Sequence, residues 1–190
     1  MSLWNLENRF TGEMDIDLTT QGEDEARSAG KVLKNVQLDI AFTSVLKRAI
    51  HTLTIVLAEM EINIPIIKSR ALNERNYGEL QGFNKAEVEK EYGLEKVLLW
   101  RRSYATRPPG GESLEDTFNR VVPYYLKEIR PFLNKGKTVL IVAHGNSLRA
   151  LIMYLENLNE KAIESLDVAT GIPIVFEFSS DMKFIKKTYL

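Results

Sequence analysis

The sequence predicts a three-layer α/β/α fold in which helices cover both faces of a mostly parallel sheet. Two observations lead to this prediction. Short apolar runs of strand length alternate with longer segments of helical periodicity along most of the chain. Most connections between these runs are long enough to contain a helix, as crossovers between parallel strands require. The chain of 190 residues has no internal repeat and no linker-like tract, so a single domain over residues 1–190 is expected.

The first third of the chain predicts two helices and two strands. A threonine cap, early acidic residues and later alanines indicate the first helix. Apolar residues at helical spacing indicate the second, and short apolar or isoleucine-rich runs indicate the strands. In chain order they are the helix Thr20–Leu33, the strand Leu38–Ser44, the helix Lys47–Met60 and the strand Ile62–Ile67.

The remaining two thirds predict four more helices, one strand and a hairpin. The longest helix is expected to bend at Pro123, or to begin only there, because proline lacks the N–H that a helix interior needs. The helices are Lys85–Tyr92, Leu94–Tyr104, Ser113–Leu133 and Ser147–Leu155; the strand is Thr138–Ala143, and the hairpin joins Ile172–Phe178 to Lys183–Tyr189 around Ser180 and Asp181.

Composition narrows the classes of function. The formal net charge of −1 predicts no general affinity for nucleic acid or for an anionic membrane, so any anion site must be a local cluster of cations. The absence of cysteine excludes disulfides and thiolate metal ligands, and two histidines make a multi-histidine metal site improbable. No apolar run reaches 18 residues and no signal peptide is recognisable, which predicts a cytoplasmic protein.

Two strand-to-helix corners supply cationic or proton-transferring side chains. His144 follows the strand Thr138–Ala143, and Arg48 follows the strand that ends at Ser44. Ligands of parallel sheets bind beyond the carboxyl ends of the strands, where helix N-termini attract anions. If the two strands are neighbours, His144 and Arg48 are expected to form a phosphate-sized pocket, since arginine binds phosphate oxygens in pairs.

A polar segment between Leu72 and Gly82 lacks clear periodicity and contains Glu74, Arg75 and Tyr77. This composition is typical of a functional loop. Lys85, Arg101 and Arg102 lie nearby in sequence and either belong to the site or are solvated surface charges. His51, one turn into a helix, is interpreted as structural.

These segments together resemble a known family. The motif Asn-Glu-Arg-x-Tyr-Gly at Asn73–Gly78, the pair Arg101–Arg102, the segment around Arg48 and the segment Ala143–Ala150 are similar to the 2,3-bisphosphoglycerate-dependent phosphoglycerate mutases of the histidine phosphatase superfamily. The passage from Pro108 into Gly110–Ser113 resembles the short bacterial form. The resemblance implies interconversion of 3-phosphoglycerate and 2-phosphoglycerate in glycolysis and gluconeogenesis through a phosphohistidine, primed by 2,3-bisphosphoglycerate and without a metal.

The resemblance also implies the roles of individual residues. Glu74 would be the general acid/base, while His144 and Arg48 would stabilise charge on the transferring phosphoryl group. The substrate-binding residues would be Asn5, Thr11, Gly12, Arg48, Glu74, Arg75, Asn76, Tyr77, Lys85, Arg101, Arg102, Gly145 and Asn146. Small phosphorylated glycerates would be the ligands, and relatives are commonly homo-oligomers.

One departure from the family pattern affects these expectations. The family's phosphorylated histidine lies in an Arg-His-Gly motif at the end of a first, central strand, and Trp4–Asn5 matches the tail of that motif. His144 matches the second histidine of the family, so the chain as given is expected to lack its nucleophile and that strand, and to be inactive. An internal start codon or a degenerate paralogue would explain this.

Loss of an inner strand leaves backbone groups unpaired on both sides of the gap, each at a cost of about 1–3 kcal/mol if buried. We therefore expect a fold that closes the gap, borrows a strand in a rearranged dimer, or is marginally stable. Two other functions remain open. A broad-specificity histidine phosphatase would not need Lys85, Arg101 and Arg102, and a non-catalytic protein would bind phosphorylated ligands without turnover.

Overall fold

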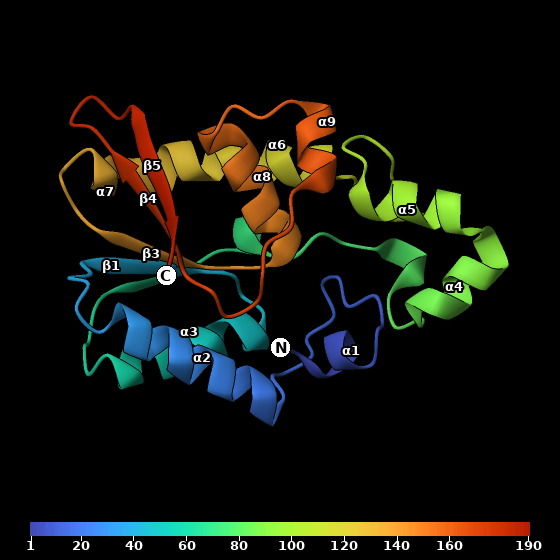
Figure 1. Cartoon of the computed structure of the whole chain (residues 1–190), viewed down its shortest axis with the longest axis horizontal. Helices are drawn as coiled ribbons and strands as arrows, with labels where there is room; N and C mark the ends of the chain where they lie inside the picture. Colours follow the sequence, from blue (N-terminus) through green and yellow to red (C-terminus); the bar gives the residue numbers. More distant parts are fainter.

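The computed structural model describes residues 1–190 and has the predicted α/β/α layering (Figure 1). Three parallel strands form the central sheet in the order β2-β1-β3. The helices α2 and α3 cover one face, whereas α6 and α8 cover the other. The helices are α1 (Leu3–Leu6), α2 (Thr20–Leu33), α3 (Lys47–Glu59), α4 (Lys85–Tyr92), α5 (Leu94–Arg102), α6 (Leu114–Tyr124), α7 (Arg130–Leu133), α8 (Gly145–Leu155) and α9 (Glu160–Ser165); the strands are β1 (Ile40–Thr43), β2 (Ile66–Lys68), β3 (Val139–Val142), β4 (Ile174–Phe178) and β5 (Phe184–Tyr189).

Most predicted elements are confirmed with small shifts of their ends. Helix α2 has the predicted bounds, and the Thr19 side chain accepts a hydrogen bond from the Gly22 N–H as its cap. Helix α8 begins at Gly145, two residues earlier than predicted, because His144 already has the extended backbone of an N-cap. The short helices α1 and α9 were not predicted, since neither has a full period of apolar residues.

The predicted long helix Ser113–Leu133 is interrupted in the structure. Helix α6 ends at Tyr124, a π-helical turn occupies Tyr125–Ile129, and α7 follows. Pro123 lies inside α6 and Pro131 lies in α7, and neither can donate the backbone hydrogen bond of a regular helix. The bend that Pro123 predicts is therefore present as a change of helical pitch rather than as a late helix start.

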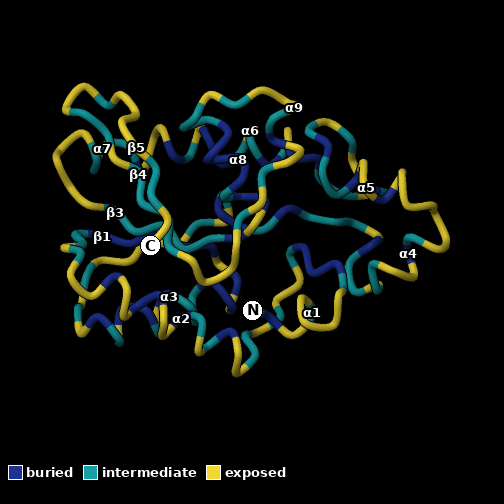
Figure 2. The backbone as a smooth tube through the Cα atoms, viewed as in Figure 1, coloured by how far each residue is buried: buried dark blue, intermediate teal, exposed yellow.

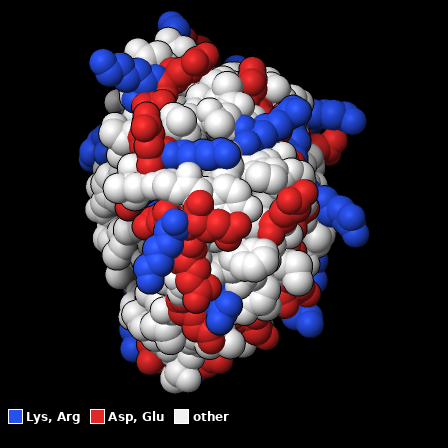
Figure 3. Space-filling model, turned by 90° about the vertical axis from the view of Figure 1, so that its right-hand side faces the viewer, with Lys and Arg blue, Asp and Glu red and all other residues white.

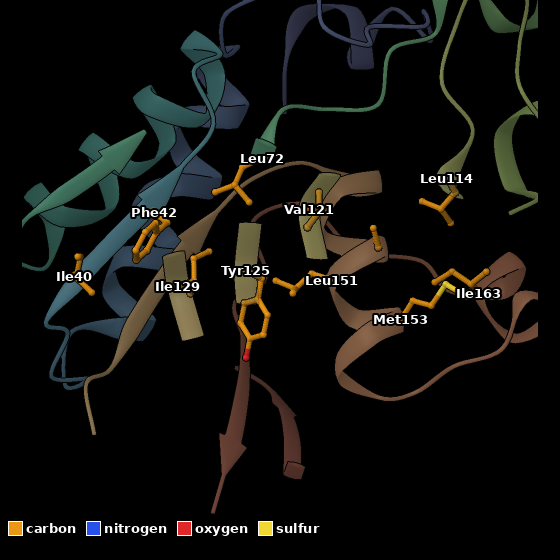
Figure 4. Packing of buried hydrophobic residues seen from close by; sticks show 11 residues of the cluster. Ile40, Phe42, Leu72, Leu114, Val121, Tyr125, Ile129, Leu151, Met153 and Ile163 are labelled. Carbon is orange, nitrogen blue, oxygen red and sulfur yellow. The ribbon is translucent and has the colours of Figure 1, made fainter. Parts of the chain in front are cut away.

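Strand β1 is the centre of the core because it is buried on both faces (Figure 2). Its side chains alternate. Ile40 and Phe42 pack with residues of α6 and α8, including Val121 and Leu151, as Figure 4 shows. Ala41 packs with Leu53 and Leu57 of α3 on the other face. This period of two places apolar side chains on both faces, as expected for a strand inside a parallel sheet.

All four residues of β3 are aliphatic, yet the strand is half-buried along its whole length, whereas β1 is fully buried. It pairs with β1 from Val139 to Val142, and no strand pairs with its other edge. Strands β4 and β5 form a separate antiparallel hairpin, as predicted around Ser180 and Asp181. A cavity of about 990 Å³ lies between β3 and β4, which both line it. Because β3 and β4 do not pair, the expected closure of the sheet within this chain is not seen.

Helix α6 begins with a charged cap that makes stability depend on pH. The Asp116 carboxylate accepts hydrogen bonds from Arg107 and from the Ser113 N–H and hydroxyl, which lower the pKa of Asp116 to about 2 despite partial burial. Replacing Asp116 with asparagine should cost about 1 kcal/mol of unfolding free energy at neutral pH. Because the folded pKa lies below the unfolded value of 3.8, this difference should persist above about pH 4 and disappear as pH falls through 2.

Urea unfolding of the wild type and of Asp116→Asn at pH 7, 4 and 2 measures this effect. Asp24→Asn is the matched control, because Asp24 is an exposed helical carboxylate that also pairs with an arginine. A difference between wild type and Asp116→Asn that stayed constant down to pH 2 would contradict the assignment.

Candidate active site

The His144 side chain is buried at the carboxyl end of β3, where it also begins α8. Its Nε2 lies 2.7 Å from the Ser44 Oγ, at the end of the neighbouring strand β1. The Ser44 Oγ also accepts the Leu46 N–H, so its proton is available to Nε2, which favours the tautomer with hydrogen on Nδ1. Burial, followed by the charges of Arg48 and Arg120, lowers the pKa of His144 well below its usual value. His144 is therefore a neutral hydrogen-bonding group at physiological pH.

Arg48 comes from the corresponding corner after β1, as the sequence predicted, and lines the same cavity as His144. Its Nη1 donates to the Met14 carbonyl and its Nη2 to the Gly12 carbonyl, each at 2.8 Å. Burial lowers the pKa of Arg48, but the guanidinium remains charged at neutral pH. These bonds fix a positive charge at the cavity wall and join it to the segment around Gly12.

The carboxylate of Glu74 lies at the N-terminus of α8. Its Oε1 accepts hydrogen bonds from the Asn146 N–H at 3.0 Å and from the Arg75 N–H at 2.9 Å. Its Oε2 has no hydrogen-bond partner and lies close to Gly145. The two oxygens therefore differ in their contacts: two backbone N–H groups hold Oε1, whereas no group of the chain donates to Oε2.

A second set of contacts orients Asn146. The Arg149 Nη1 donates to the Asn146 Oδ1 at 2.9 Å, so the amide nitrogen of Asn146 faces the Tyr77 hydroxyl at 3.4 Å. Burial would raise the pKa of Tyr77, but the charge and hydrogen bond of Arg75 outweigh it and leave the pKa lowered. Asn146 and Tyr77 both line the cavity as polar groups of fixed orientation.

The N-terminal segment also lines the cavity. Asn5, Thr11 and Gly12 line the cavity, and the Thr11 hydroxyl donates to the Asn5 Oδ1 at 3.0 Å. Gly12 has a φ of +53°, which favours glycine, and a Cβ there would also displace the Gln81 side chain, whose Oε1 would lie 2.0 Å away. Lys85 also lines the cavity, and burial followed by the charge of Arg101 lowers its pKa.

The structure does not bring every predicted site residue to the cavity. Its lining includes Asn5, Thr11, Gly12, Arg48, Glu74, Tyr77, Lys85, His144, Gly145 and Asn146. The other four predicted residues lie behind or beside this set. Arg75 is fully buried against the Tyr77 ring, Asn76 bonds to Glu13, Arg101 pairs with Glu89, and Arg102 pairs with Asp167.

Arg75 does not reach the cavity, although two of its nitrogens lack partners. Its Nη2 donates to the Tyr77 hydroxyl and to the Arg101 carbonyl, whereas its Nε and Nη1 are buried without a partner. Buried donors without partners are rare in proteins. His51, by contrast, is partly exposed on α3 outside the cavity lining, with Nδ1 3.0 Å from the Asp17 carboxylate.

Sequence reasoning missed the residues that hold the Glu74 loop. The Arg120 guanidinium donates to the carbonyls of Ala71, Asn73 and Glu74, and also pairs with both carboxylate oxygens of Glu112. Glu112 in turn accepts the Asn76 N–H. Ser44, Glu13 and Arg149 were also missed as supporting residues. In the sequence, Arg120 is only an arginine within a predicted helix. Because many helices contain such residues, the sequence does not mark it as a supporting residue.

The described side chains form no group of three or more His, Asp or Glu that could hold a metal ion. No helix is both long enough and apolar enough to cross a membrane. On the face shown in Figure 3, acidic and basic side chains are interspersed.

The fold and the site define a class of proteins, and comparison with known families identifies it. Residues 1–189 match the family model described as histidine phosphatase superfamily (branch 1), and the chain belongs to this superfamily. Among solved structures, the Bacillus stearothermophilus protein YhfR superposes with a TM-score of 0.86 at 26% identity, over 97% of this chain and 89% of that one. A mycobacterial glucosyl-3-phosphoglycerate phosphatase superposes with a TM-score of 0.83 at 23% identity, over 100% of this chain and 92% of that one, which supports the fold alone.

Curated relatives place the chain more narrowly within the superfamily. A protein of Cytophaga hutchinsonii is 57% identical over 189 residues, covering 100% of this chain and 89% of its own length. One from Bartonella henselae is 54% identical over 192 residues, covering 100% of this chain and 93% of its own length. Both relatives are named 2,3-bisphosphoglycerate-dependent phosphoglycerate mutase. The chain belongs to this mutase family.

Proposed function

We propose that the cavity binds phosphorylated glycerates and that its residues serve the interconversion of 3-phosphoglycerate and 2-phosphoglycerate. The observation that carries this proposal is the position of Glu74 in a cationic cavity. A phosphatase needs cations and a proton donor for the leaving group. A mutase must also move protons to and from a substrate hydroxyl in the same site, and the free Glu74 Oε2 suits that task.

Different residues of the cavity would bind the two anionic groups of the ligand. Arg48 and the neutral donors of His144 and Asn146 line one region of the cavity, where they would surround phosphoryl oxygens and stabilise negative charge. Lys85 would bind the second anionic group of the ligand, whereas Arg75 is fully buried behind Tyr77 and would act on the ligand only through its positive charge. Arg101 and Arg102 would join them only by leaving their ion pairs with Glu89 and Asp167.

2,3-Bisphosphoglycerate, when bound, would supply the phosphoryl group that primes the reaction. The same cations fit this ligand, since it differs from the substrate by one further phosphate. The proposed partners are thus small phosphorylated glycerates, in a cytoplasmic protein that assembles as a homo-oligomer. No metal is required, because arginine and lysine neutralise the phosphate charge.

Neither histidine of the chain suits the role of phosphoryl acceptor. His144 already has Nε2 bonded to Ser44, and His51 is paired with Asp17 on an exposed helix surface away from the cavity lining. We therefore propose that residues 1–190 bind the glycerates but do not turn them over. This behaviour is also that of the non-catalytic binding protein considered from the sequence.

Calorimetric titration with 3-phosphoglycerate and with phenyl phosphate separates the mutase site from a broad-specificity phosphatase site. A glycerate site with Lys85 predicts at least tenfold tighter binding of 3-phosphoglycerate, which amounts to about 1.4 kcal/mol. Equal affinity for the two compounds would favour the phosphatase. An enolase-coupled assay on the same chain should give no turnover, and activity would show that a histidine of this chain accepts the phosphoryl group.

A further inference from the structure

Arg149 is a buried arginine on α8 that forms no ion pair. The residue is 4% exposed, and all of its hydrogen bonds go to carbonyl or amide oxygens. Its Nη1 donates to the Asn146 Oδ1 at 2.9 Å and its Nη2 to the Ile163 carbonyl at 2.7 Å, while its Nε has no partner. A buried charge without a partner costs stability, and sequences tolerate such a cost chiefly at functional sites.

Arg149 determines which way the Asn146 amide points. The oxygen and nitrogen of an asparagine amide have almost the same shape, so only their hydrogen-bond partners distinguish the two orientations. A guanidinium has donors and no acceptor, so only the Asn146 oxygen can face it. The Asn146 Nδ2 therefore points away from Arg149, and it donates to the Tyr77 hydroxyl at 3.4 Å.

The Tyr77 hydroxyl receives a second donor from another buried arginine. Arg75, which is fully buried, donates from Nη2 to the Tyr77 oxygen at 2.7 Å, and its Cζ lies 4.6 Å from the centre of the Tyr77 ring. A phenol oxygen accepts up to two hydrogen bonds and donates one. Because Arg75 and Asn146 both donate to this oxygen, the Tyr77 proton remains free to be donated, and Tyr77 lines the cavity.

We propose that Arg149 and Arg75 are positioning residues that hold Tyr77 as a hydrogen-bond donor to an anionic oxygen of the ligand. We call the hydrogen bonds from Arg149 through Asn146, and from Arg75, to the Tyr77 hydroxyl the Tyr77 network. They all run from a buried cation toward the cavity, and hydrogen bonds of one direction polarise one another. The network favours a phosphate or carboxylate oxygen over a hydroxyl group at this point of the ligand. The proposal rests on the proposed function only for the choice of a phosphoglycerate as ligand.

Titration of Tyr77 in the absence of ligand tests the network. Burial alone would raise the pKa of Tyr77, whereas the charge of Arg75 and the hydrogen bonds from Arg75 and Asn146 lower it. Isotope labels on the tyrosine Cζ atoms make the titrations visible by NMR, and Tyr77→Phe assigns the signal. In Arg149→Met, Tyr77 should titrate at higher pH than in the wild type, because the Asn146 amide is free to turn over. Arg149→Lys keeps a donor for the Asn146 oxygen, so its titration should lie closer to that of the wild type.

A control variant separates the network from the packing around Arg149. Ile163 is fully buried, so Ile163→Ala weakens the packing of α9, but its backbone carbonyl can still accept the hydrogen bond from Arg149. The titration of Tyr77 should be the same in Ile163→Ala as in the wild type. An unchanged titration in Arg149→Met, or an equal displacement in Arg149→Met and Ile163→Ala, would overturn the proposal.

The orientation of Asn146 can also be measured in the wild type, which does not depend on the folding of a variant. An Asn146 Nδ2 proton should show a nuclear Overhauser effect to the Tyr77 ring, because this nitrogen lies 3.4 Å from the Tyr77 hydroxyl. Absence of this effect while the Asn146 amide signals are resolved would show that the amide has the other orientation, and would overturn the proposal.

A double-mutant cycle tests whether ligand binding depends on the network. By calorimetry, Arg149→Met should weaken binding of 3-phosphoglycerate about tenfold in the wild-type background and less than about twofold in Asn146→Ala. Equal weakening in both backgrounds would contradict an action of Arg149 through Asn146. If the wild type did not bind 3-phosphoglycerate at all, the proposed function would fail, whereas the titration of Tyr77 would still decide whether the network exists.

Discussion

Replacing Arg48 with methionine is expected to lower the affinity for 2,3-bisphosphoglycerate by roughly 100-fold, the largest effect of any single change in the cavity. Arg48 is buried and charged, and it faces the same cavity as Glu74 and His144. A hydrogen bond to a charged group contributes about 1.5–3 kcal/mol, and 100-fold corresponds to about 2.7 kcal/mol. Calorimetric titration at constant ionic strength measures the loss.

Two further variants separate ligand binding from general charge and folding effects. Arg27→Met removes the same charge from an exposed position on α2, where Arg27 pairs with Glu23 and Asp24, and should leave affinity unchanged. Arg48→Lys keeps the charge but loses the planar fork, so its affinity should lie between those of wild type and Arg48→Met. Equal affinity of Arg48→Met and wild type would remove Arg48 from the site.

Replacing Arg120 with methionine is expected to destabilise the fold by about 2–3 kcal/mol and to weaken glycerate binding as well. The change removes every bond to the carbonyls of Ala71, Asn73 and Glu74, and leaves the half-buried Glu112 carboxylate without its partner. The Arg120–Glu112 ion pair keeps some contact with solvent. The loss of unfolding free energy is therefore smaller than for a fully buried ion pair. Urea unfolding measures the stability.

The effect of Arg120 on binding must be separated from its effect on stability. Titrations well below the melting temperature of the variant should still show weaker binding, because the loop that positions the Glu74 carboxylate is no longer held. Asp116→Asn serves as the control, since it weakens the start of the same helix without touching that loop. If both variants bound 3-phosphoglycerate as the wild type does, Arg120 would have only a structural role.

Local patterns predicted most of the fold because the elements depend on near neighbours in sequence. The cap at Thr19 and the apolar runs of β1 and β3 were sufficient to locate their elements. The interruption of the helix after Tyr124 was harder to predict. A proline indicates that a regular helix is disturbed, but it does not show whether the helix bends, changes its pitch or begins there. The edge position of β3 could be expected only from the family resemblance.

The site was predictable where residues lie at strand ends and less so where they act through tertiary contacts. His144 and Arg48 share one cavity, as expected for residues that follow neighbouring strands, and Glu74, which the family resemblance placed at the site, lines it too. The ion pairs of Arg101 and Arg102 could not be foreseen, because Glu89 and Asp167 come from separate helical and loop segments. The hydrogen bond from Arg149 to Asn146 depends on the side-chain conformations of two residues on α8. The sequence does not determine these conformations.

The most direct test of the account is a calorimetric titration of the 190-residue chain with 2,3-bisphosphoglycerate. The account predicts one ligand per chain, competition by 3-phosphoglycerate and weaker binding at high salt, because the contacts are mainly charged. No detectable heat at millimolar ligand, or binding that persists unchanged in Arg48→Met, would contradict the claim that this cavity is a phosphoglycerate site.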